Sequence, residues 1–479
     1  MAKNITPRDK NFSEWYQDVI KAGEMADHSP VKGCMVIRPD GYGIWEQMQA
    51  KLDRRFKELG HVNAYFPLLI PESFILKEAE HVEGFAPELA VVTHAGGKEL
   101  EERLVIRPTS ETIIGHMYSK WVQSYRDLPV LINQWCNVMR WEMRTRLFLR
   151  TTEFLWQEGH TAHETHAEAQ EETLKMLEVY RWFLEDICAI PVIPGAKPEH
   201  EKFPGAETTY TVEAMMQDCK ALQSATSHNL GQNFAKAFEI QYSDRENLLQ
   251  HAWTTSWGCT TRMIGALIMT HGDDDGIIVP PRLAPTQVVI VPIWKQEVER
   301  EAVLAHADKI KAELGQVLDP ITIKIDARDN LRPADRFFTW IQKGVPLRIE
   351  VGPKDVEKDG GLSVRRDNRE KEPVALSDMK TRVPEILEAI QVGLYERALT
   401  FRKDHSYVVD DYEEFKKIMA GDGGFVHAHW DGTRETAEKI QTETKATIRC
   451  LPLGGVDEPG VCMVTGKPSA RRVIFAQSY

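Results

Sequence analysis

Two arginine-containing stretches lie on either side of the middle of the chain, and their residue types suit a site that holds phosphate. The first runs from Arg140-Trp-Glu142 to Glu158, and the second is Trp257-Gly-Cys-Thr-Thr-Arg262. A guanidinium is a planar charged fork that binds phosphate or carboxylate at two points, and a neighbouring carboxylate accepts a proton from an amine such as that of adenine. Gly258 lets the backbone approach a ligand closely, and an arginine at the start of the following helix reaches a second phosphate. Together the two stretches predict a site that grips a nucleotide.

Each stretch taken alone has a more ordinary interpretation. Arg-x-Glu is more often an exposed strand with an ion pair, and the second stretch resembles any strand-to-helix turn with a surface arginine. The local crowding of arginines changes this balance, because the chain as a whole carries a net charge of −13. A basic loop in an acidic chain indicates a polyanion. If residues 131–144 form one strand, alternation places Arg140 and Glu142 on the same face.

Composition bounds the class of protein. With 479 residues, 42% apolar and 27% charged, the chain predicts two to four globular domains. The acidic balance excludes a generally basic nucleic-acid coat, so any nucleic acid must be bound locally. Seven cysteines without a Cys-x-x-Cys pair fit reduced thiols. No secretory leader and no apolar run of about 18 residues is present, so we expect a cytoplasmic protein without a membrane partner.

The order of predicted elements indicates an α+β fold. Residues 41–59 read as an amphipathic helix, and a proline-flanked extended segment follows at 61–71. Helix plus edge strand suits a subunit interface. Several strand-like segments then follow, with one long helix at 164–187, and runs of strands with helices grouped elsewhere favour α+β over an alternating parallel domain. We expect a first domain over 1–282, a β-α-β-α-β domain over 286–402 and a small α/β module over 403–479.

At this point the residues resemble a known family, the class II prolyl-tRNA synthetases of the type without an editing insertion. The segment around Pro67-Leu-Leu69 is similar to motif 1, Arg140-x-Glu142 with Phe154 to motif 2, and Gly258-x-x-x-Arg262 to motif 3. Two further motifs, Arg107-Pro-Thr-Ser-Glu111 and the stretch from His271 to Pro281, are more restrictive. The resemblance covers essentially the whole chain. It implies an antiparallel class II catalytic domain, an α/β anticodon-binding domain and a small α/β C-terminal module.

The resemblance assigns roles to residues that match the family motifs. It implies that Thr109 and Glu111 receive the secondary ammonium of proline, and that Arg140 holds the carboxylate and the α-phosphate. Further proline-pocket positions are Trp156, Glu158, His160, Phe203, His228 and Ser256. The ATP-binding positions are Arg140, Glu142, Thr151, Phe154, Gln223, Thr226 and Arg262. Outside this context, His160 and His228 would be interpreted as hydrogen-bonded core histidines.

Metal ligands and the anticodon surface are also implied. Glu213 and Glu207 are candidate carboxylates for a Mg²⁺ ion that accompanies ATP, although each alone reads as a surface charge. For the anticodon the candidates are Arg348, Glu350, Lys354 and Asp355, which can hydrogen-bond unpaired bases; Arg348 and Glu350 also fit the solvated face of a strand.

The C-terminal module departs from the family pattern. Asp431 and Thr436 stand where many relatives have the first pair of zinc-binding cysteines, and Cys462-Met-Val-Thr465 keeps one cysteine of the second. Threonine is a poor zinc ligand, so we expect no zinc. His427 and His429 are alternative ligands or ordinary strand residues. Tyr479 matches the terminal tyrosine of the family, which implies that the tail packs near the catalytic domain.

The implied reaction is ATP-dependent ligation of L-proline to tRNA(Pro) through a prolyl-adenylate, with release of AMP and pyrophosphate, by a homodimer. Arg140 and Arg262 would carry the catalysis. Only about sixty residues separate His160 from Leu222, too few for an editing domain. Two alternatives remain: a synthetase-like regulator, disfavoured because Arg140, Glu142, Glu111 and Arg262 are all present, and a class II synthetase for threonine, glycine or histidine.

Overall fold

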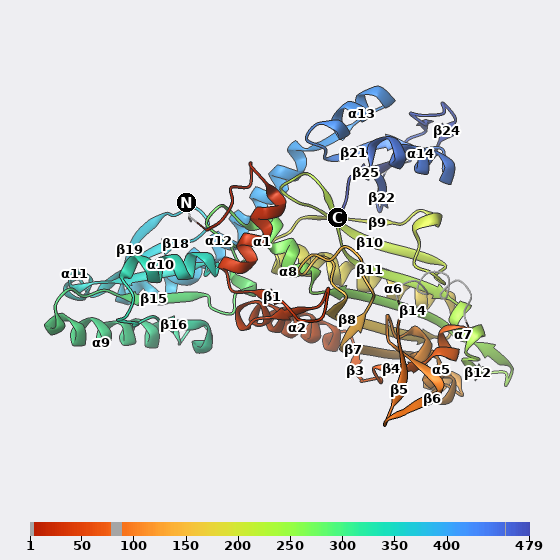
Figure 1. The fold of residues 1–479 in the computed structure, drawn as a ribbon, viewed down its shortest axis with the longest axis horizontal. Coiled ribbons are helices and arrows are strands. Elements are labelled where there is room, and N and C mark those ends of the chain that lie inside the picture. Colours follow the sequence, from red (N-terminus) through yellow and green to blue (C-terminus); the bar gives the residue numbers. More distant parts are fainter. Residues whose placement is uncertain (1–3, 78–88, 456) are drawn as a thin grey trace.

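The computed structural model describes residues 4–77, 89–455 and 457–479. Figure 1 shows a large sheet with helices on its faces, a second sheet with long helices, and a smaller group of elements around α13 and α14. Helices and mostly antiparallel strands are mixed, so the α+β prediction is confirmed. In the described ranges, no helix combines the length and apolarity that a membrane crossing requires.

An 11-stranded sheet forms the centre of the molecule, in the order β20-β21-β25-β22-β9-β10-β11-β14-β8-β7-β3. Its catalytic part is β3 (Val62–Asn63), β7 (Val130–Met139), β8 (Glu153–His163), β9 (Val192–Ala196), β10 (Thr208–Met215), β11 (Ala221–Gly231) and β14 (Trp253–Thr260). Its C-terminal part is β20 (Ser406–Val408), β21 (Phe425–His429), β22 (Thr447–Pro452) and β25 (Arg472–Ala476). The strands from β9 to β7 pair antiparallel, whereas β3 pairs parallel to β7 at the edge.

The C-terminal module is joined to the catalytic part by the sheet itself. Leu451 and Pro452 of β22 pair with Ala196 and Gly195 of β9, so the hydrogen-bonded ladder continues between the two parts. The terminal hydroxyl of Tyr479 donates to Asp218 at 2.6 Å, which confirms that the tail packs against the catalytic domain. The remaining elements of this module are α13 (Tyr412–Ala420), α14 (Arg434–Thr444), β23 (Gly460–Val461) and β24 (Pro468–Ser469).

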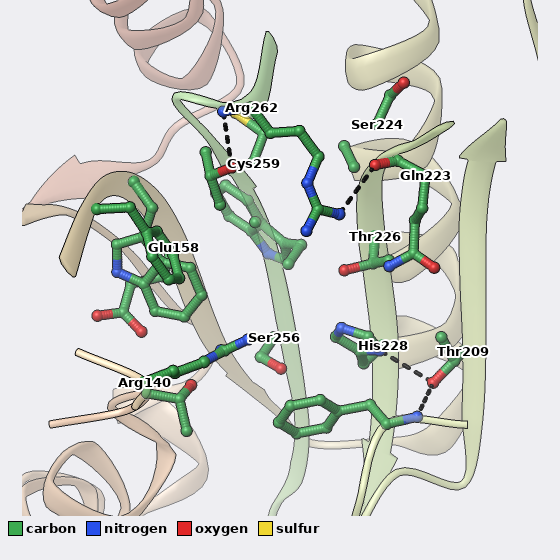
Figure 2. A pocket seen from close by; sticks show the side chains of 18 of the residues that line it. Arg140, Glu158, Thr209, Gln223, Ser224, Thr226, His228, Ser256, Cys259 and Arg262 are labelled. Atoms are coloured by element: carbon green, nitrogen blue, oxygen red, sulfur yellow. Dashed lines mark hydrogen bonds between the residues drawn. The ribbon is translucent and has the colours of Figure 1, made fainter. Parts of the chain in front are cut away.

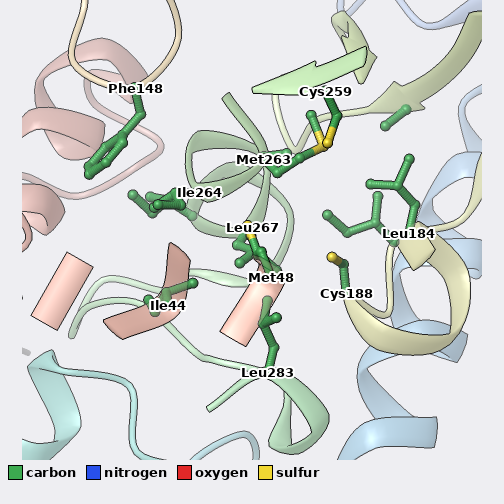
Figure 3. Close-up of a cluster of buried hydrophobic side chains, with 14 of the residues drawn as sticks. Ile44, Met48, Phe148, Leu184, Cys188, Cys259, Met263, Ile264, Leu267 and Leu283 are labelled. Carbon is green, nitrogen blue, oxygen red and sulfur yellow. The ribbon is translucent and has the colours of Figure 1, made fainter. Parts of the chain in front are cut away.

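Three helices pack against the strands of the catalytic sheet. These are α2 (Pro39–Glu58), α6 (His166–Trp182) and α8 (Arg262–His271). Proline at the first position of α2 and a capping box at Thr165 before α6 explain where two of them begin. Figure 3 shows Met48 of α2 packed with Met263 and Leu267 of α8 in the largest apolar core. Every residue of α8 after Arg262 is buried, so this helix is held rigidly.

Smaller elements surround this core. They are α1 (Phe12–Ala22), β1 (Ala26–His28), β2 (Met35–Ile37), β4 (Leu69–Pro71), α3 (Glu72–Ile75), β5 (Ala90–Ala95), β6 (Lys98–Ile106), α5 (Glu111–Trp121), α7 (Asn233–Ala237), β12 (Gln241–Ser243) and β13 (Leu249–His251). The sheet β4-β6-β5 projects at the lower edge in Figure 1, and α5 begins with Glu111, which brings that residue to the site.

The five-stranded sheet has the order β16-β15-β17-β18-β19. Its elements are β15 (Val288–Pro292), α9 (Glu297–Leu314), β16 (Ile323–Ile325), α10 (Pro333–Gln342), β17 (Leu347–Val351), α11 (Pro353–Glu357), β18 (Gly360–Arg365), β19 (Lys371–Ala375) and α12 (Met379–Asp404). Strands β16, β15 and β17 are parallel, as the β-α-β-α-β pattern predicts.

This domain is fastened to the end of α8. The guanidinium of Arg366, just after β18, donates to both carboxylate oxygens of Asp273 at 2.7 Å each. Arg369 donates to Asp275 at 2.8 Å. The acidic residues of the His271–Pro281 stretch therefore act as an interdomain contact.

Candidate active site

A cavity of about 430 Å³ opens on the face of the catalytic sheet. Strands β8, β11 and β14, the first residue of α8 and the loop between β7 and β8 form its walls (Figure 2). Cavities of this size ordinarily hold small-molecule ligands. The two arginine stretches of the sequence therefore meet at one place.

The loop after β7 differs from the strand expected for residues 131–144. Strand β7 ends at Met139, and Arg140 and Glu142 lie beyond it, so alternation along a strand is the wrong reason for their proximity. The ladder ends because the partner strand β8 begins at Glu153, opposite Met139. Both residues nevertheless line the cavity. The Nε of Arg140 donates to the backbone oxygen of Pro108 at 3.0 Å, which orients its guanidinium.

Arg262 is the first residue of α8, as the sequence predicts. Its Nε donates to the backbone oxygen of Leu149 at 3.1 Å and its Nη1 to that of Gln223 at 3.3 Å. Burial lowers the pKa of Arg262 to about 10, and Arg150 and Arg140 add to this effect. The guanidinium remains charged at neutral pH, and an anion between these arginines would relieve their mutual repulsion.

One end of the cavity is lined by carboxylates. Thr109 donates to Glu111 through its hydroxyl, so the two residues implied to receive an ammonium lie together. Glu158 is buried and accepts hydrogen bonds from Ser110 at 2.5 Å and from Gln134 at 2.7 Å. Burial opposes ionisation of Glu158, but His160 and these donors hold its pKa below the usual value. A cationic group is the ligand that this end can hold.

His160 and His228 have opposite charge preferences. Burial lowers the pKa of His160, but the Glu158 carboxylate, 2.9 Å from Nε2, more than offsets this and raises the pKa above its usual value. Burial, together with His160 and Arg140, lowers the pKa of His228 to about 3. His228 is therefore neutral at physiological pH. Its Nδ1 lies 3.0 Å from the hydroxyl of Thr209, and its ring packs on Phe203, with 4.6 Å between centroids.

The remaining predicted residues also reach the cavity. It is lined by Thr151, Phe154, Trp156, Gln223, Thr226 and Ser256 in addition to those above. Of the residues predicted to bind proline or ATP, His160 lies outside that lining, and it contacts Glu158, which belongs to it. The buried hydroxyl of Ser256 has no hydrogen-bond partner within the described residues, which leaves it to a ligand. Aromatic rings of Phe154 and Trp156 lie 5.6 Å and 5.5 Å from the guanidinium of Arg140.

Lys197, Glu201 and Lys202 line the cavity as well, and sequence reasoning missed them. They lie in the loop between β9 and β10. The charged run Lys197-Pro-Glu-His-Glu-Lys202 was the available signal. A charged loop between strands is usually solvated, so that run alone does not indicate a binding role.

The two candidate magnesium carboxylates have other contacts. Glu213 is fully buried; its Oε2 accepts from Arg449 at 2.9 Å, and its Oε1 lies 3.4 Å from Nζ of Lys197. Glu207 lies 3.2 Å from His166 and is half exposed. Nowhere in the described part of the chain do three His, Cys, Asp or Glu side chains converge as metal ligands. The surroundings of Glu213 do not fit a metal ligand, because cations already occupy both oxygens.

The four anticodon candidates lie on and after β17. Arg348 and Glu350 form an ion pair at 2.7 Å, and Arg348 stacks over Phe337 at 4.2 Å. Asp355 caps the first turn of α11 by accepting from Gly352. Strand β17 lies inside its sheet, between β15 and β18, so Arg348 and Glu350 do not lie on an edge strand, whereas Lys354 and Asp355 lie on α11.

The degenerate zinc position contains a hydrogen-bonded cluster. The carboxylate of Asp431 accepts from Thr433 at 2.8 Å, and from Thr436 and Thr465 at 3.0 Å each. These bonds connect the start of α14 with the turn between β23 and β24. The Nδ1 atom of His429 lies 3.1 Å from the hydroxyl oxygen of Ser469. This contact is typical of a buried strand residue.

Comparisons with known proteins agree with this arrangement. The sequence matches the tRNA synthetase class II core domain (G, H, P, S and T) over residues 92–271, the anticodon binding domain over 287–386 and the prolyl-tRNA synthetase C-terminal domain over 412–479. A proline–tRNA ligase of Chlorobium chlorochromatii is 57% identical over 487 residues, covering 100% of both chains. Relatives of the same name from Roseiflexus sp. and Bacteroides fragilis are 57% and 56% identical, covering 100% of this chain and 99% of their own length.

Proposed function

Because the chain belongs to the prolyl-tRNA synthetase family, we propose that the cavity on its catalytic sheet activates L-proline with ATP and passes the prolyl group to tRNA(Pro). The observation that carries this proposal is that cationic and anionic side chains line one cavity. Arg140 and Arg262 bring positive charge to it, and Glu111 and Glu158 bring negative charge. An amino acid has the matching charges, since its carboxylate suits the arginines and its ammonium suits the carboxylates.

The ammonium of proline fits the acidic end. Its ring nitrogen carries two protons when charged, and the Glu111 carboxylate with the Thr109 hydroxyl offers acceptors for both. Glu158 adds a second negative charge nearby, held by Ser110 and Gln134. The neutral ring of His228 and the aromatic Phe203 close the wall against the apolar ring of proline.

The reaction needs positioning and charge neutralisation rather than an enzyme nucleophile. The carboxylate of proline attacks the α-phosphorus of ATP, the bond to the bridging oxygen of the β-phosphate breaks, and pyrophosphate leaves. Arg140 holds the attacking carboxylate and the α-phosphate, and Arg262 stabilises the charge that builds up on the phosphates. The 3′-terminal hydroxyl of tRNA then attacks the carbonyl carbon of the prolyl-adenylate, and AMP leaves.

The side chains that line the rest of the cavity suit the adenine, ribose and phosphates of ATP. Glu142 accepts from the exocyclic amine, and Phe154 stacks on the base, with Thr151, Gln223 and Thr226 beside the ribose and phosphates. Mg²⁺ would enter with the ATP phosphates. No step of this mechanism is assigned to a metal held by Glu213.

The same proposal extends to partners. Arg348, Glu350, Lys354 and Asp355 are the residues proposed to read the anticodon, because they combine donors and acceptors on one domain. We also propose a cytoplasmic homodimer, supported by the open edge strand β3, where Val62 and the nearby Tyr65 are 60% and 71% exposed. All seven cysteines are free thiols, which suits that compartment.

Proline-dependent exchange of pyrophosphate into ATP tests the core of the proposal. We expect the unmodified protein to catalyse exchange with proline and not with threonine, glycine or histidine. Arg140→Ala removes the group that bridges both substrates and should abolish exchange. Near-normal exchange in that variant would refute the role of Arg140, and exchange with another amino acid alone would refute the choice of substrate.

A further inference from the structure

A buried charge cluster lies directly behind the ATP side of the cavity, and one of its members comes from the C-terminal part of the chain. Glu213 on β10 is completely buried. Its Oε2 accepts from Nε and Nη2 of Arg449 at 3.0 Å and 2.9 Å. Arg449 lies on β22, which is 236 residues away in sequence. The C-terminal part therefore contributes a cation to the interior of the catalytic domain.

The other carboxylate oxygen faces the cavity wall. Oε1 of Glu213 accepts from Thr211 at 2.9 Å and lies 3.4 Å from Nζ of Lys197. Lys197 lines the cavity, although its side chain is only 4% exposed. Glu213 thus has Arg449 on one oxygen and a cavity-lining cation on the other. Although burial opposes ionisation, Arg449 and Lys197 hold the pKa of Glu213 below its usual value.

The pKa of Arg262 depends on the same charge cluster. Glu213 opposes the effect of burial on the pKa of Arg262, whereas Arg449 acts in the same direction as burial. A buried carboxylate that loses one partner attracts the remaining cations more strongly, because its charge must be compensated inside the protein. Without Arg449, Glu213 would draw Lys197 toward itself.

We propose that Arg449 is a positioning residue for adenylate formation: by compensating the charge of Glu213, it leaves Lys197, which lines the cavity, available to the phosphates of ATP. The inference rests on the proposed function of the cavity. It also replaces the metal-ligand hypothesis for Glu213, because a carboxylate enclosed by Arg449, Lys197 and Thr211 has no open coordination position.

The experiment measures proline-dependent ATP–pyrophosphate exchange in full-length variants, with KM determined separately for ATP and proline. In Arg449→Met, KM for ATP should rise about tenfold while KM for proline stays within about twofold. Arg449→Lys keeps the charge but replaces the two-nitrogen contact of the guanidinium by a single ammonium nitrogen, and its KM for ATP should rise about threefold. Arg434→Met, an exposed arginine of the same module, is the matched control and should change neither constant.

A second substitution separates positioning from simple loss of structure. Adding Glu213→Gln to Arg449→Met removes the uncompensated charge, so the double variant should recover KM for ATP to within about threefold of the unmodified protein. The concentration of Mg²⁺ needed for half-maximal exchange should be unchanged in Glu213→Gln. Thermal unfolding followed by circular dichroism confirms that each variant is folded at the assay temperature.

Several results would overturn the inference. Equal rises in both KM values, or no recovery in the double variant, would make Arg449 an ordinary structural residue. A raised Mg²⁺ requirement in Glu213→Gln would make Glu213 a metal ligand after all. Absence of proline-dependent exchange in the unmodified protein would refute the proposed function as well, so the two failures are distinguishable.

Discussion

Replacement of Glu158 by glutamine is the sharpest test of the acidic end of the cavity. The change keeps the shape of the side chain and removes one negative charge. Glu158 is 2% exposed; Ser110, Gln134 and Cys136 donate to its Oε1, and Nε2 of His160 lies 2.9 Å from its Oε2. The amide has only one accepting oxygen, so its NH₂ group takes the place of one of these two carboxylate oxygens.

The expected rise in KM for proline follows from the energy of hydrogen bonds to a buried charge. A hydrogen bond to a buried charged group contributes about 1.5–3 kcal/mol, and a misplaced donor costs a similar amount. Taking about 3 kcal/mol for the altered attraction to the proline ammonium gives about a 100-fold rise in KM for proline, since each 1.4 kcal/mol is about tenfold. KM for ATP should change by less than about threefold, because the contacts of Glu158 are all at the acidic end.

The assay is proline-dependent ATP–pyrophosphate exchange with each substrate varied in turn. Glu171→Gln removes the same charge from a side chain that is 77% exposed on α6, and it should leave both KM values unchanged. Thermal unfolding reports whether Glu158→Gln remains folded. An unchanged KM for proline, or an equal rise in both constants, would refute the reasoning that this carboxylate serves the ammonium.

Three further predictions concern stability and assembly. Three buried histidines have lowered pKa values, about 4 for His163 and about 3 for His228 and His271. Folding favours their neutral forms, so the free energy of unfolding has its full value above about pH 6.5 and should fall by about 4 kcal/mol per pH unit below it. Urea unfolding between about pH 6 and 4.5 measures this slope. His271→Gln should reduce the slope by about a third, and an unchanged slope would contradict the prediction. Arg366→Ala breaks the buried pair with Asp273, at a cost of about 3–5 kcal/mol, and should reduce tRNA charging while proline-dependent exchange stays within about twofold. Arg332→Ala is its control, because this side chain is 83% exposed and pairs with Asp335 of the same domain. Parallel losses in both assays would count against an interdomain role. Asp431→Ala should cost about 2 kcal/mol and lower the thermal midpoint, and elemental analysis should find no zinc; one tightly bound zinc per chain would contradict the hydrogen-bonded cluster.

Much of the site was accessible from local sequence. Arg262 begins α8 directly after the end of β14, where a strand-to-helix turn was expected, and Gly258 lies inside that strand; a glycine before an apolar run with an arginine at its start is a local signal. The loop after β7 misled the strand prediction because Trp141 and Met143 continue the alternation of Met139. Trp141 is 47% and Met143 79% exposed, so their apolar character reflects something other than a buried strand face. Periodicity alone cannot separate these cases.

The contacts of Glu213 show which part of a site local sequence does not encode. The sequence predicts Glu213 as a candidate magnesium carboxylate because Mg²⁺ usually binds one or two carboxylates together with phosphate oxygens, although this glutamate alone is typical of a surface charge. Its actual partner, Arg449, reaches it only because β22 continues the catalytic sheet beside β9. That pairing brings together residues from opposite ends of the chain, and nothing in either segment specifies it. The charge of a buried carboxylate is set by its nearest cations, so its role follows from tertiary pairing. For this reason the ligand-facing arginines could be predicted from motifs, whereas the residues that hold them in place required the structure.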